Sequence, residues 1–132
     1  MVSTINATSS GLTSTGDNSG IIKVQSNGVT VSALAWVNFN GVTTVSVRAS
    51  YNVSSVTRTS AGDYTINFTN AMADANYVLA GCAGYNSTNT PALVQPYGLS
   101  PPTTTSVRVQ TGWTNGTNND VLTVNAVIFG NS

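Results

Sequence analysis

The sequence predicts an all-β protein, an antiparallel β-sandwich or jelly-roll-like knob with an extended N-terminal arm. Three observations support this prediction. Val, Ile and other apolar residues recur at every second position in several segments, which is the period of a strand with one buried face. Turn residues separate these segments at intervals of about 8 to 15 residues, among them Asn-Gly pairs at 27–28 and 40–41. No segment shows a long period of 3.6 residues, so a helical fold is excluded.

Residues 1–30 are predicted to form an attachment arm, and residues 31–132 the knob. Up to residue 20 the chain consists mostly of Ser, Thr, Gly and Asn, which cannot form a core of their own. One interpretation is a floppy tail. The hypothesis we prefer is that the arm docks on a neighbouring subunit or a larger surface through its few apolar side chains, Val2, Ile5 and Leu12.

From residue 21, near the end of the arm, through the first half of the knob, the chain is predicted to form a series of short strands. In order, they cover residues 21–25, 29–39, 43–49, 53–59 and 64–69. The last of these alternates Tyr64, Ile66 and Phe68 with polar residues, which is typical of a half-buried strand. Trp36 lies in the alternating segment 29–39, and we interpret it as a core or interface residue.

The second half begins with a connection at 70–76, followed by a strand at 77–85. That strand is expected to be central, because its small residues favour close approach of a neighbouring backbone. Residues 86–103 hold all four prolines and predict a surface excursion with a short edge strand at 92–95. Strands at 104–111 and 121–129, joined by a loop at 112–120, complete the chain.

The composition excludes several classes of function. The 132 residues include 4 Lys+Arg, 4 Asp+Glu and no His, so the net charge is zero and most acid–base chemistry near neutral pH is unavailable. The four cations, at positions 23, 48, 58 and 108, lie in separate segments and cannot neutralise a run of phosphates. Cys82 has no His to act as its base, and we interpret it as a small core residue. We predict no enzyme, no catalytic residue, no cofactor and no nucleic-acid partner.

Two further classes are also excluded by the sequence. No run approaches the roughly 18 apolar residues of a membrane span, and residues 1–6 do not resemble a secretory signal, so no membrane partner is expected. Asp120 lies among Thr117, Asn118 and Asn119, which are oxygen ligands suited to Ca²⁺. Dedicated calcium loops gather several carboxylates and this loop has one, so we predict a solvated hairpin loop and no metal site.

Two aromatic residues are candidates for binding. Trp113 lies in the loop at 112–120, and Tyr97 lies in the proline-rich excursion, each near Asn, Thr or Ser. Aromatic rings on loops commonly anchor the loop or a subunit contact. They can also stack on a sugar ring while neighbouring amides bind its hydroxyls, so both interpretations are kept for Tyr97 and Trp113.

Three segments match the pattern of a known module in order and spacing. They are Ala-Trp-Val-Asn-Phe-Asn-Gly at 35–41, Val-Arg-Ala-Ser-Tyr-Asn-Val-Ser-Ser-Val at 47–56, and Gly-Asp-Tyr-Thr-Ile-Asn-Phe-Thr-Asn-Ala-Met-Ala-Asp-Ala-Asn-Tyr at 62–77. Together they resemble a module found near the C-termini of bacteriophage tail-fibre and related virion proteins. The resemblance covers about residues 35–85.

This resemblance implies a trimeric β knob on the surface of a phage particle, with no enzymatic residues. Only residues 1–34 precede the module, and a tail fibre needs a long shaft, so we expect a capsid decoration (cement) protein instead. Such a protein would be assembled in the host cytoplasm and bind the outside of the head as a homotrimer. There it would stabilise the shell through the major capsid protein or another virion protein. The alternatives are a tail-fibre tip or receptor-binding knob that recognises host surface glycans, and a free carbohydrate-binding module.

Overall fold

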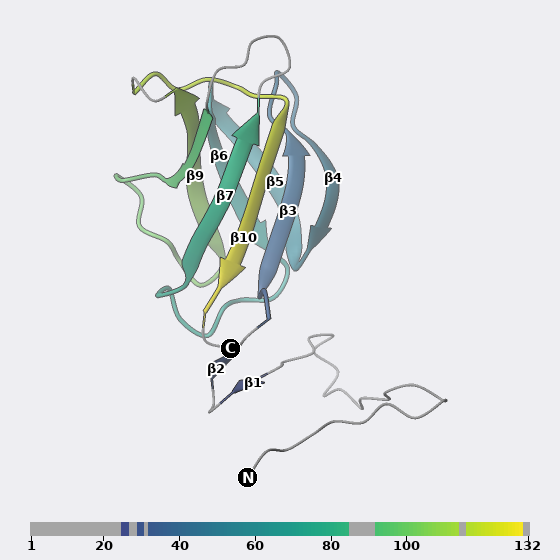
Figure 1. The fold of residues 1–132 in the computed structure, drawn as a ribbon, viewed down its shortest axis with the longest axis vertical. Coiled ribbons are helices and arrows are strands. Elements are labelled where there is room, and N and C mark those ends of the chain that lie inside the picture. Colours follow the sequence, from purple (N-terminus) through teal and green to yellow (C-terminus); the bar gives the residue numbers. More distant parts are fainter. Residues whose placement is uncertain (1–24, 27–28, 31, 85–91, 114–115, 131–132) are drawn as a thin grey trace, which may run out of the picture.

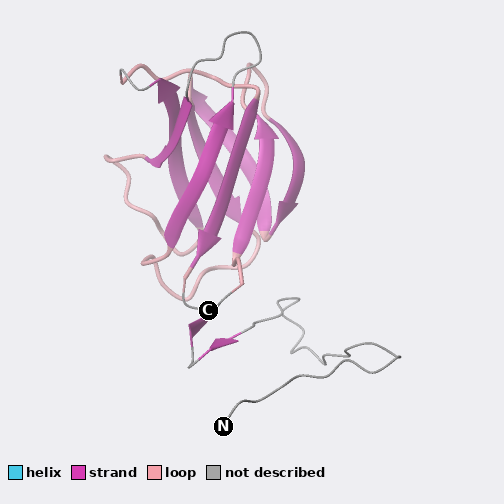
Figure 2. Ribbon diagram, viewed as in Figure 1, coloured by secondary structure: helices cyan, strands magenta, loops and turns pink. Residues whose placement is uncertain are grey.

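The computed structural model describes residues 25–26, 29–30, 32–84, 92–113 and 116–130 (Figure 1). These residues form ten strands and no helix, as Figure 2 shows. In chain order the strands are β1 (Gln25–Ser26), β2 (Val29–Thr30), β3 (Ala35–Asn40), β4 (Ser46–Tyr51), β5 (Val53–Ser60), β6 (Asp63–Phe68), β7 (Val78–Gly84), β8 (Ala92–Pro96), β9 (Ser106–Trp113) and β10 (Thr123–Phe129). The predicted antiparallel all-β class is confirmed.

Eight of the strands form one antiparallel sheet in the order β4-β3-β10-β7-β8-β9-β6-β5, nearly closed into a barrel. In Figure 1, β3, β4, β7 and β10 make the front layer, and β5, β6 and β9 lie behind them. The two end strands, β4 and β5, follow each other directly in the chain, so the sheet folds over at the residue between them. β1 and β2 pair only with each other in a separate two-stranded sheet.

The core fills the space between the two layers. The predicted alternation holds in β3, β6, β9 and β10, where every second side chain is buried. Phe39 and Tyr64 face each other across the core, edge to face, with ring centroids 5.1 Å apart. The buried apolar residues are Leu34, Ala35, Val37, Phe39, Tyr64, Ile66, Phe68, Met72, Val107, Val109, Val121, Val124, Ala126 and Ile128.

Some predicted boundaries were wrong. The strand expected over 29–39 is divided into β2 and β3, because the chain joins the barrel only near Leu34, whose N–H donates to the carbonyl of Ile128 (2.8 Å). The predicted arm contacts Val2, Ile5 and Leu12 lie outside the described residues. The predicted edge strand at 92–95 is β8, which is not an edge but lies between β7 and β9.

Asn52 makes the corner between the two end strands. It has a positive φ of 53°, a conformation that Asn tolerates better than most residues. Its side-chain amide donates to the carbonyls of Leu34 (3.0 Å) and Asn70 (3.2 Å), and its side-chain oxygen accepts the N–H of Asn70 (2.8 Å). One side chain therefore ties the start of β3 and the connection after β6 to the corner.

Substituting Asn52 should separate the backbone role of this residue from its hydrogen-bonding role. We expect Asn52→Ala to lower the free energy of unfolding by about 2–4 kcal/mol, because it loses the amide contacts and disfavours positive φ. Asn52→Gly loses the same contacts without the φ penalty, so it should be more stable than the Ala variant by about 1 kcal/mol. Urea denaturation measures both. An Ala variant as stable as the wild type would contradict this role.

Candidate functional site

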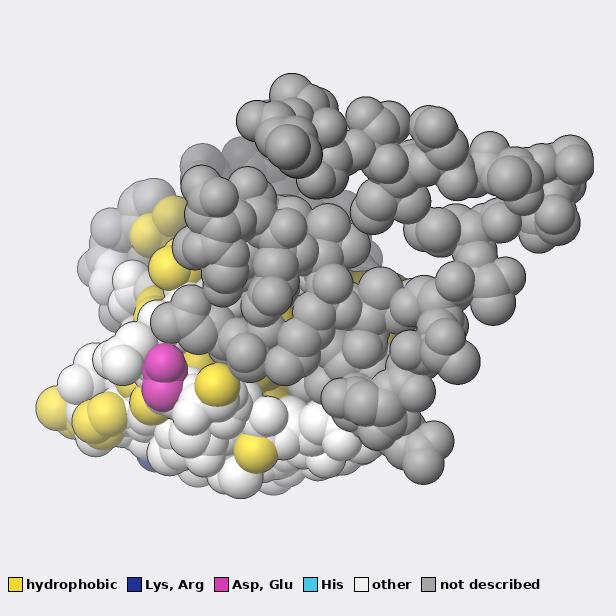
Figure 3. All heavy atoms as spheres, turned by 90° about the horizontal axis from the view of Figure 1, so that it is seen from below, with side chains coloured by type: hydrophobic (Ala, Val, Ile, Leu, Met, Phe, Trp, Pro, Cys, Tyr) yellow, Lys and Arg dark blue, Asp and Glu magenta, His cyan; other side chains and the backbone are white. Residues whose placement is uncertain are grey.

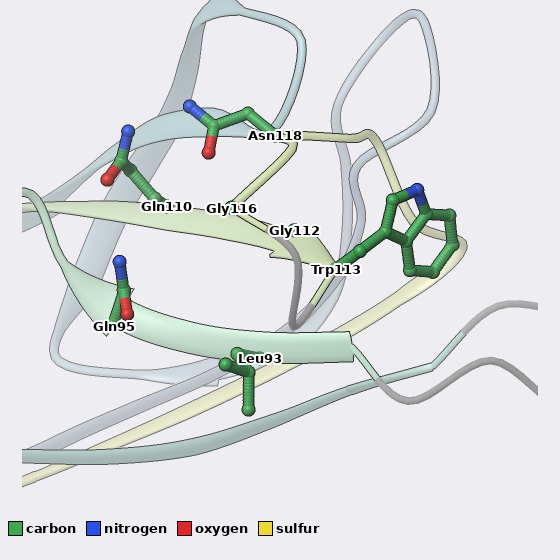
Figure 4. Close-up of a pocket in the computed structure, with 7 residues that line it drawn as sticks. All are labelled: Leu93, Gln95, Gln110, Gly112, Trp113, Gly116 and Asn118. Carbon is green, nitrogen blue, oxygen red and sulfur yellow. The ribbon is translucent and has the colours of Figure 1, made fainter.

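A hollow of about 280 Å³ lies on the outer face of β8 and β9, beside the loop that leads to β10 (Figure 4). Two glutamines in it, Gln95 and Gln110, lie directly opposite each other in the β8–β9 ladder, and Leu93 lies opposite Gly112. The inward-facing Val94 between Leu93 and Gln95 packs against the core, which directs its two neighbours outward. The lining residues are Leu93, Gln95, Gln110, Gly112, Trp113, Gly116 and Asn118.

The loop after β9 folds back to make one wall of the hollow. Trp113 accepts the N–H of Gly116 (3.1 Å) and donates its own to the carbonyl of Thr117 (2.9 Å), while Gly112 pairs with Asn118. A Cβ at Gly112 would lie 2.5 Å from the Thr117 carbonyl oxygen. Glycine at this position therefore lets the loop approach β9 closely enough to bring Asn118 beside the strand.

The far end of this loop is anchored by the carboxylate of Asp120. Its two oxygens accept hydrogen bonds from Arg58 Nε (3.0 Å) and Nη2 (2.8 Å), and its Oδ1 also accepts the backbone N–H of Gly62 (2.8 Å). The Tyr64 hydroxyl lies 2.8 Å from Oδ1 and 3.0 Å from the carbonyl of Gly41. We call this group the Asp120 clasp. The prediction of a solvated loop was wrong for Asp120, whose side chain is only 18% exposed.

The clasp fixes the ionisation of its members. Burial favours the neutral acid, but the hydrogen bonds from Arg58, Gly62 and Tyr64 outweigh it, so the pKa of Asp120 lies below its usual value. Burial, together with the hydrogen bond to the Asp120 carboxylate, raises the pKa of the Tyr64 hydroxyl, which stays protonated and able to donate.

Three carboxamides gather at one end of the hollow. Figure 4 shows the side chains of Gln95, Gln110 and Asn118 near one another, with the Trp113 ring at the opposite end and directed away from them. None of the three amide side chains forms a hydrogen bond within the part of the chain that the structure describes. Each offers both donors and an acceptor, and no lining residue is charged. The hollow is therefore suited to uncharged polar groups.

The two predicted aromatic contacts lie at opposite ends of the β8–β9 pair. Trp113 lines the hollow, whereas the Tyr97 ring stacks on the Arg108 guanidinium, 4.2 Å from the ring centroid. Arg108 lies five residues from Trp113 along β9, or roughly 17 Å at strand spacing. Arg108 also donates to Asp63 (Nε to Oδ1, 2.8 Å), and this hydrogen bond lowers the pKa of the Asp63 carboxyl.

Sequence reasoning missed Gln95 and Gln110. Nothing in their local sequence distinguishes them from other surface amides, because they are 15 positions apart and only the strand register brings them together. The one signal that was available is that each occupies an outward position of an alternating strand.

A second surface lies on the outer face of β7, β10 and β3. Val127 lies opposite both Trp36 and Ala80, and Phe129 lies opposite Val78; we call these five residues the apolar face. Trp36 is 39% exposed, Phe129 41% and Val78 63%. Trp36 is therefore not a core residue, which leaves the interface interpretation. Figure 3 shows the molecule from below, where hydrophobic side chains lie among uncharged ones and beside an acidic side chain in the part drawn in colour.

A polar row runs beside the apolar face across four strands. Arg48 donates to Asn38 Oδ1 (3.3 Å), Asn38 donates to Asn125 Oδ1 (2.5 Å), and Asn125 donates to Cys82 Sγ (3.4 Å). Cys82 is exposed, so its interpretation as a core residue was wrong. Both faces of β7 carry small residues, and alternation alone could not tell which face points inward. The close approach predicted there does occur, since a Cβ at Gly81 would lie 2.5 Å from the carbonyl oxygen of Asn125.

The two lowered carboxyl pKa values predict how stability depends on pH. Because Asp63 and Asp120 have lower pKa values folded than unfolded, their contribution is fully present above the unfolded pKa of about 3.9. It is lost as the pH falls through the folded values, so the free energy of unfolding should fall from about pH 4 downward. Urea denaturation between about pH 2 and pH 7 measures it.

The variant Asp120→Asn should flatten part of this acid dependence and lower stability at pH 7 by about 1–3 kcal/mol, because the Arg58 guanidinium loses its charged partner. Combining it with Asp63→Asn should flatten the dependence further. If the free energy of unfolding of the double variant fell with decreasing pH as steeply as that of the wild type, other groups would set the acid dependence.

The described residues hold no cluster of three or more His, Cys, Asp or Glu side chains placed to bind a metal ion. Among the same residues there is no helix that is long and apolar enough to cross a membrane. No family model, curated protein or solved structure matches this chain.

Proposed function

We propose that this chain is a non-enzymatic structural protein of a phage particle, a homotrimeric decoration (cement) protein on the outside of the head. The observation that carries the proposal is the apolar face, where Trp36, Val78 and Phe129 are exposed together. Large apolar side chains that share one face of a sheet are typical of a surface covered by another protein. We assign that role to further copies of the same chain.

The charge of the face favours self-association. Its five residues are uncharged, and in the adjoining polar row Arg48 already donates to Asn38 and to the Leu122 carbonyl (2.6 Å). A partner therefore needs no complementary charge, and copies of a chain with zero net charge do not repel one another. Symmetric association would remove the apolar face from water at about 25 cal/mol for each Å² buried.

The resemblance to virion proteins also supports the proposal, because many of the matching residues shape the fold. Asn52 makes the corner, and Gly62 has a φ of 66°, with its ideal Cβ position 2.3 Å from the Thr111 carbonyl oxygen. The Tyr77 hydroxyl lies 3.0 Å from each of the carbonyl oxygens of Thr103 and Ser106, between which its one hydrogen is shared. The residues that match the module are thus residues that shape the barrel. The resemblance implies that such a barrel is a knob on a phage particle.

As a cement protein the chain would act by mass action. Binding the assembled shell more tightly than free capsid subunits stabilises the assembled state. The major capsid protein, or another virion protein, would be the partner of the arm at 1–30, whose predicted contact residues Val2, Ile5 and Leu12 lie outside the described part of the chain.

Self-association through the apolar face predicts a specific pattern of Cys82 reactivity. The wild-type chain should sediment as a trimer, and its Cys82, beside the apolar face, should react slowly with a thiol reagent. Trp36→Ser should give monomers whose Cys82 reacts at least tenfold faster, whereas the control Leu99→Ser, at a side chain 86% exposed and outside the face, should change neither result. A wild-type chain that is monomeric at high concentration contradicts the assembly.

The cement role predicts that particles lacking the protein release their genome at a lower temperature than complete particles.

Counting the copies of this protein in each particle tests where the protein lies in the particle. Hundreds of copies support the head, whereas a few to a few dozen would favour the alternative, a tail-fibre tip that recognises host glycans. The hollow with its three carboxamides is the observation that favours this alternative. Particles with and without the protein that release their genome at the same temperature would rule out the cementing role.

A further inference from the structure

We infer that the hollow on β8 and β9 binds an uncharged carbohydrate. A decoration protein that only stabilises a shell needs no such site, so this inference goes beyond the proposed cement role. It depends on three properties of the hollow, which are its unpartnered amides, its lack of charge and the exposed apolar side chain of Leu93 beside them.

The three carboxamides favour a ligand rich in hydroxyl groups. On the opposite side of the barrel, Asn38 and Asn125 satisfy each other across β3 and β10. Gln95, Gln110 and Asn118 have no such partners within the described residues, although Gln110 is half-buried. A carboxamide donates and accepts at once, and so does a sugar hydroxyl, so each amide can bind a pair of neighbouring hydroxyls.

The surroundings of the amides disfavour a negatively charged ligand. The charged group nearest to Gln110 in the sheet is Asp63, which lies directly opposite it in the β6–β9 ladder. The neighbouring Arg108 is held by the Asp63 carboxylate and by the Tyr97 ring. Among the described residues, no cation beside the hollow is therefore available to an acidic sugar, a phosphate or a nucleic-acid backbone, because the Asp63–Arg108 ion pair has no net charge to attract one.

An exposed apolar side chain lies on the same face as the amides. Leu93 is 48% exposed and lies two residues from Gln95 on β8, so both side chains point to the same side of the sheet. Gly112 lies opposite Leu93 without a side chain, so the floor is open backbone at this point (Figure 4). A sugar on this face can place hydroxyls on the amides and rest the apolar face of its ring against Leu93.

The test is a titration of the full chain with defined sugars, measured by calorimetry. The neutral probes are maltohexaose, cellohexaose, mannohexaose and chitohexaose, and the acidic probes are sialyllactose and trigalacturonate. We expect at least one neutral hexaose to bind and the acidic probes not to bind. Affinity should change less than twofold when the salt concentration is raised. Failure of all four hexaoses, or equal binding of the acidic probes, would overturn the inference.

Variants locate the binding within the hollow. The double variant Gln95→Ala/Gln110→Ala and the single variant Leu93→Ser should each weaken binding of the hexaose at least tenfold, because they remove the amides and the apolar contact on this face. The control is Asn76→Ala, which removes an exposed amide from the connection between β6 and β7 and should have no effect. Binding that survives the double variant would place the ligand elsewhere. The Trp36→Ser monomer should bind as the wild type does, so failure of assembly and failure of sugar binding are distinguished.

Discussion

The carboxylate of Asp120 is the point through which the two layers of the barrel are joined at one end. It lies just before β10, in the front layer, and accepts hydrogen bonds from Arg58 on β5, from the turn at Gly62 and from Tyr64 on β6, in the layer behind. Tyr64 also lies against Gly41, where a side chain would collide with its hydroxyl. In a chain with so few charges, this one ionised group is hydrogen-bonded from three sides, so the cost of its burial is offset.

The strand pattern could be predicted from the sequence because burial of alternate side chains is a local property. The alternation of Tyr64, Ile66 and Phe68 with polar residues predicts a half-buried strand, and all three side chains are buried. The order of the strands within the sheet could not be predicted in this way, because strands far apart in the chain become neighbours only in the folded sheet. This is why the proximity of Gln95 and Gln110 could not be predicted. The prediction that Cys82 is a core residue was wrong for a related reason. Because β7 has small residues on both faces, its alternation does not show which face is buried.

The residues that shape the barrel and the residues that line the hollow lie in different parts of the chain. Residues 35–85, which carry the resemblance, supply the corner at Asn52 and the clasp partners at 58, 62 and 64. Every lining residue of the hollow comes from residues 93–118, outside that stretch. Two chains that share the first part can therefore share the barrel and still differ in what their outer surface binds.

The anchoring of the loop at 113–118 has a consequence for how such proteins can diversify. On one side Thr111 and Asn119 exchange hydrogen bonds, with Thr111 Oγ1 donating to the Asn119 carbonyl (2.7 Å) and the Asn119 N–H donating to that of Thr111 (3.0 Å). On the other side Asp120 is fixed by the clasp. Because both ends are held by the barrel, the segment between them can be exchanged for one of different sequence or length at little cost to folding. The barrel can thus carry interchangeable surface segments, whether they are exchanged by natural recombination or grafted in the laboratory.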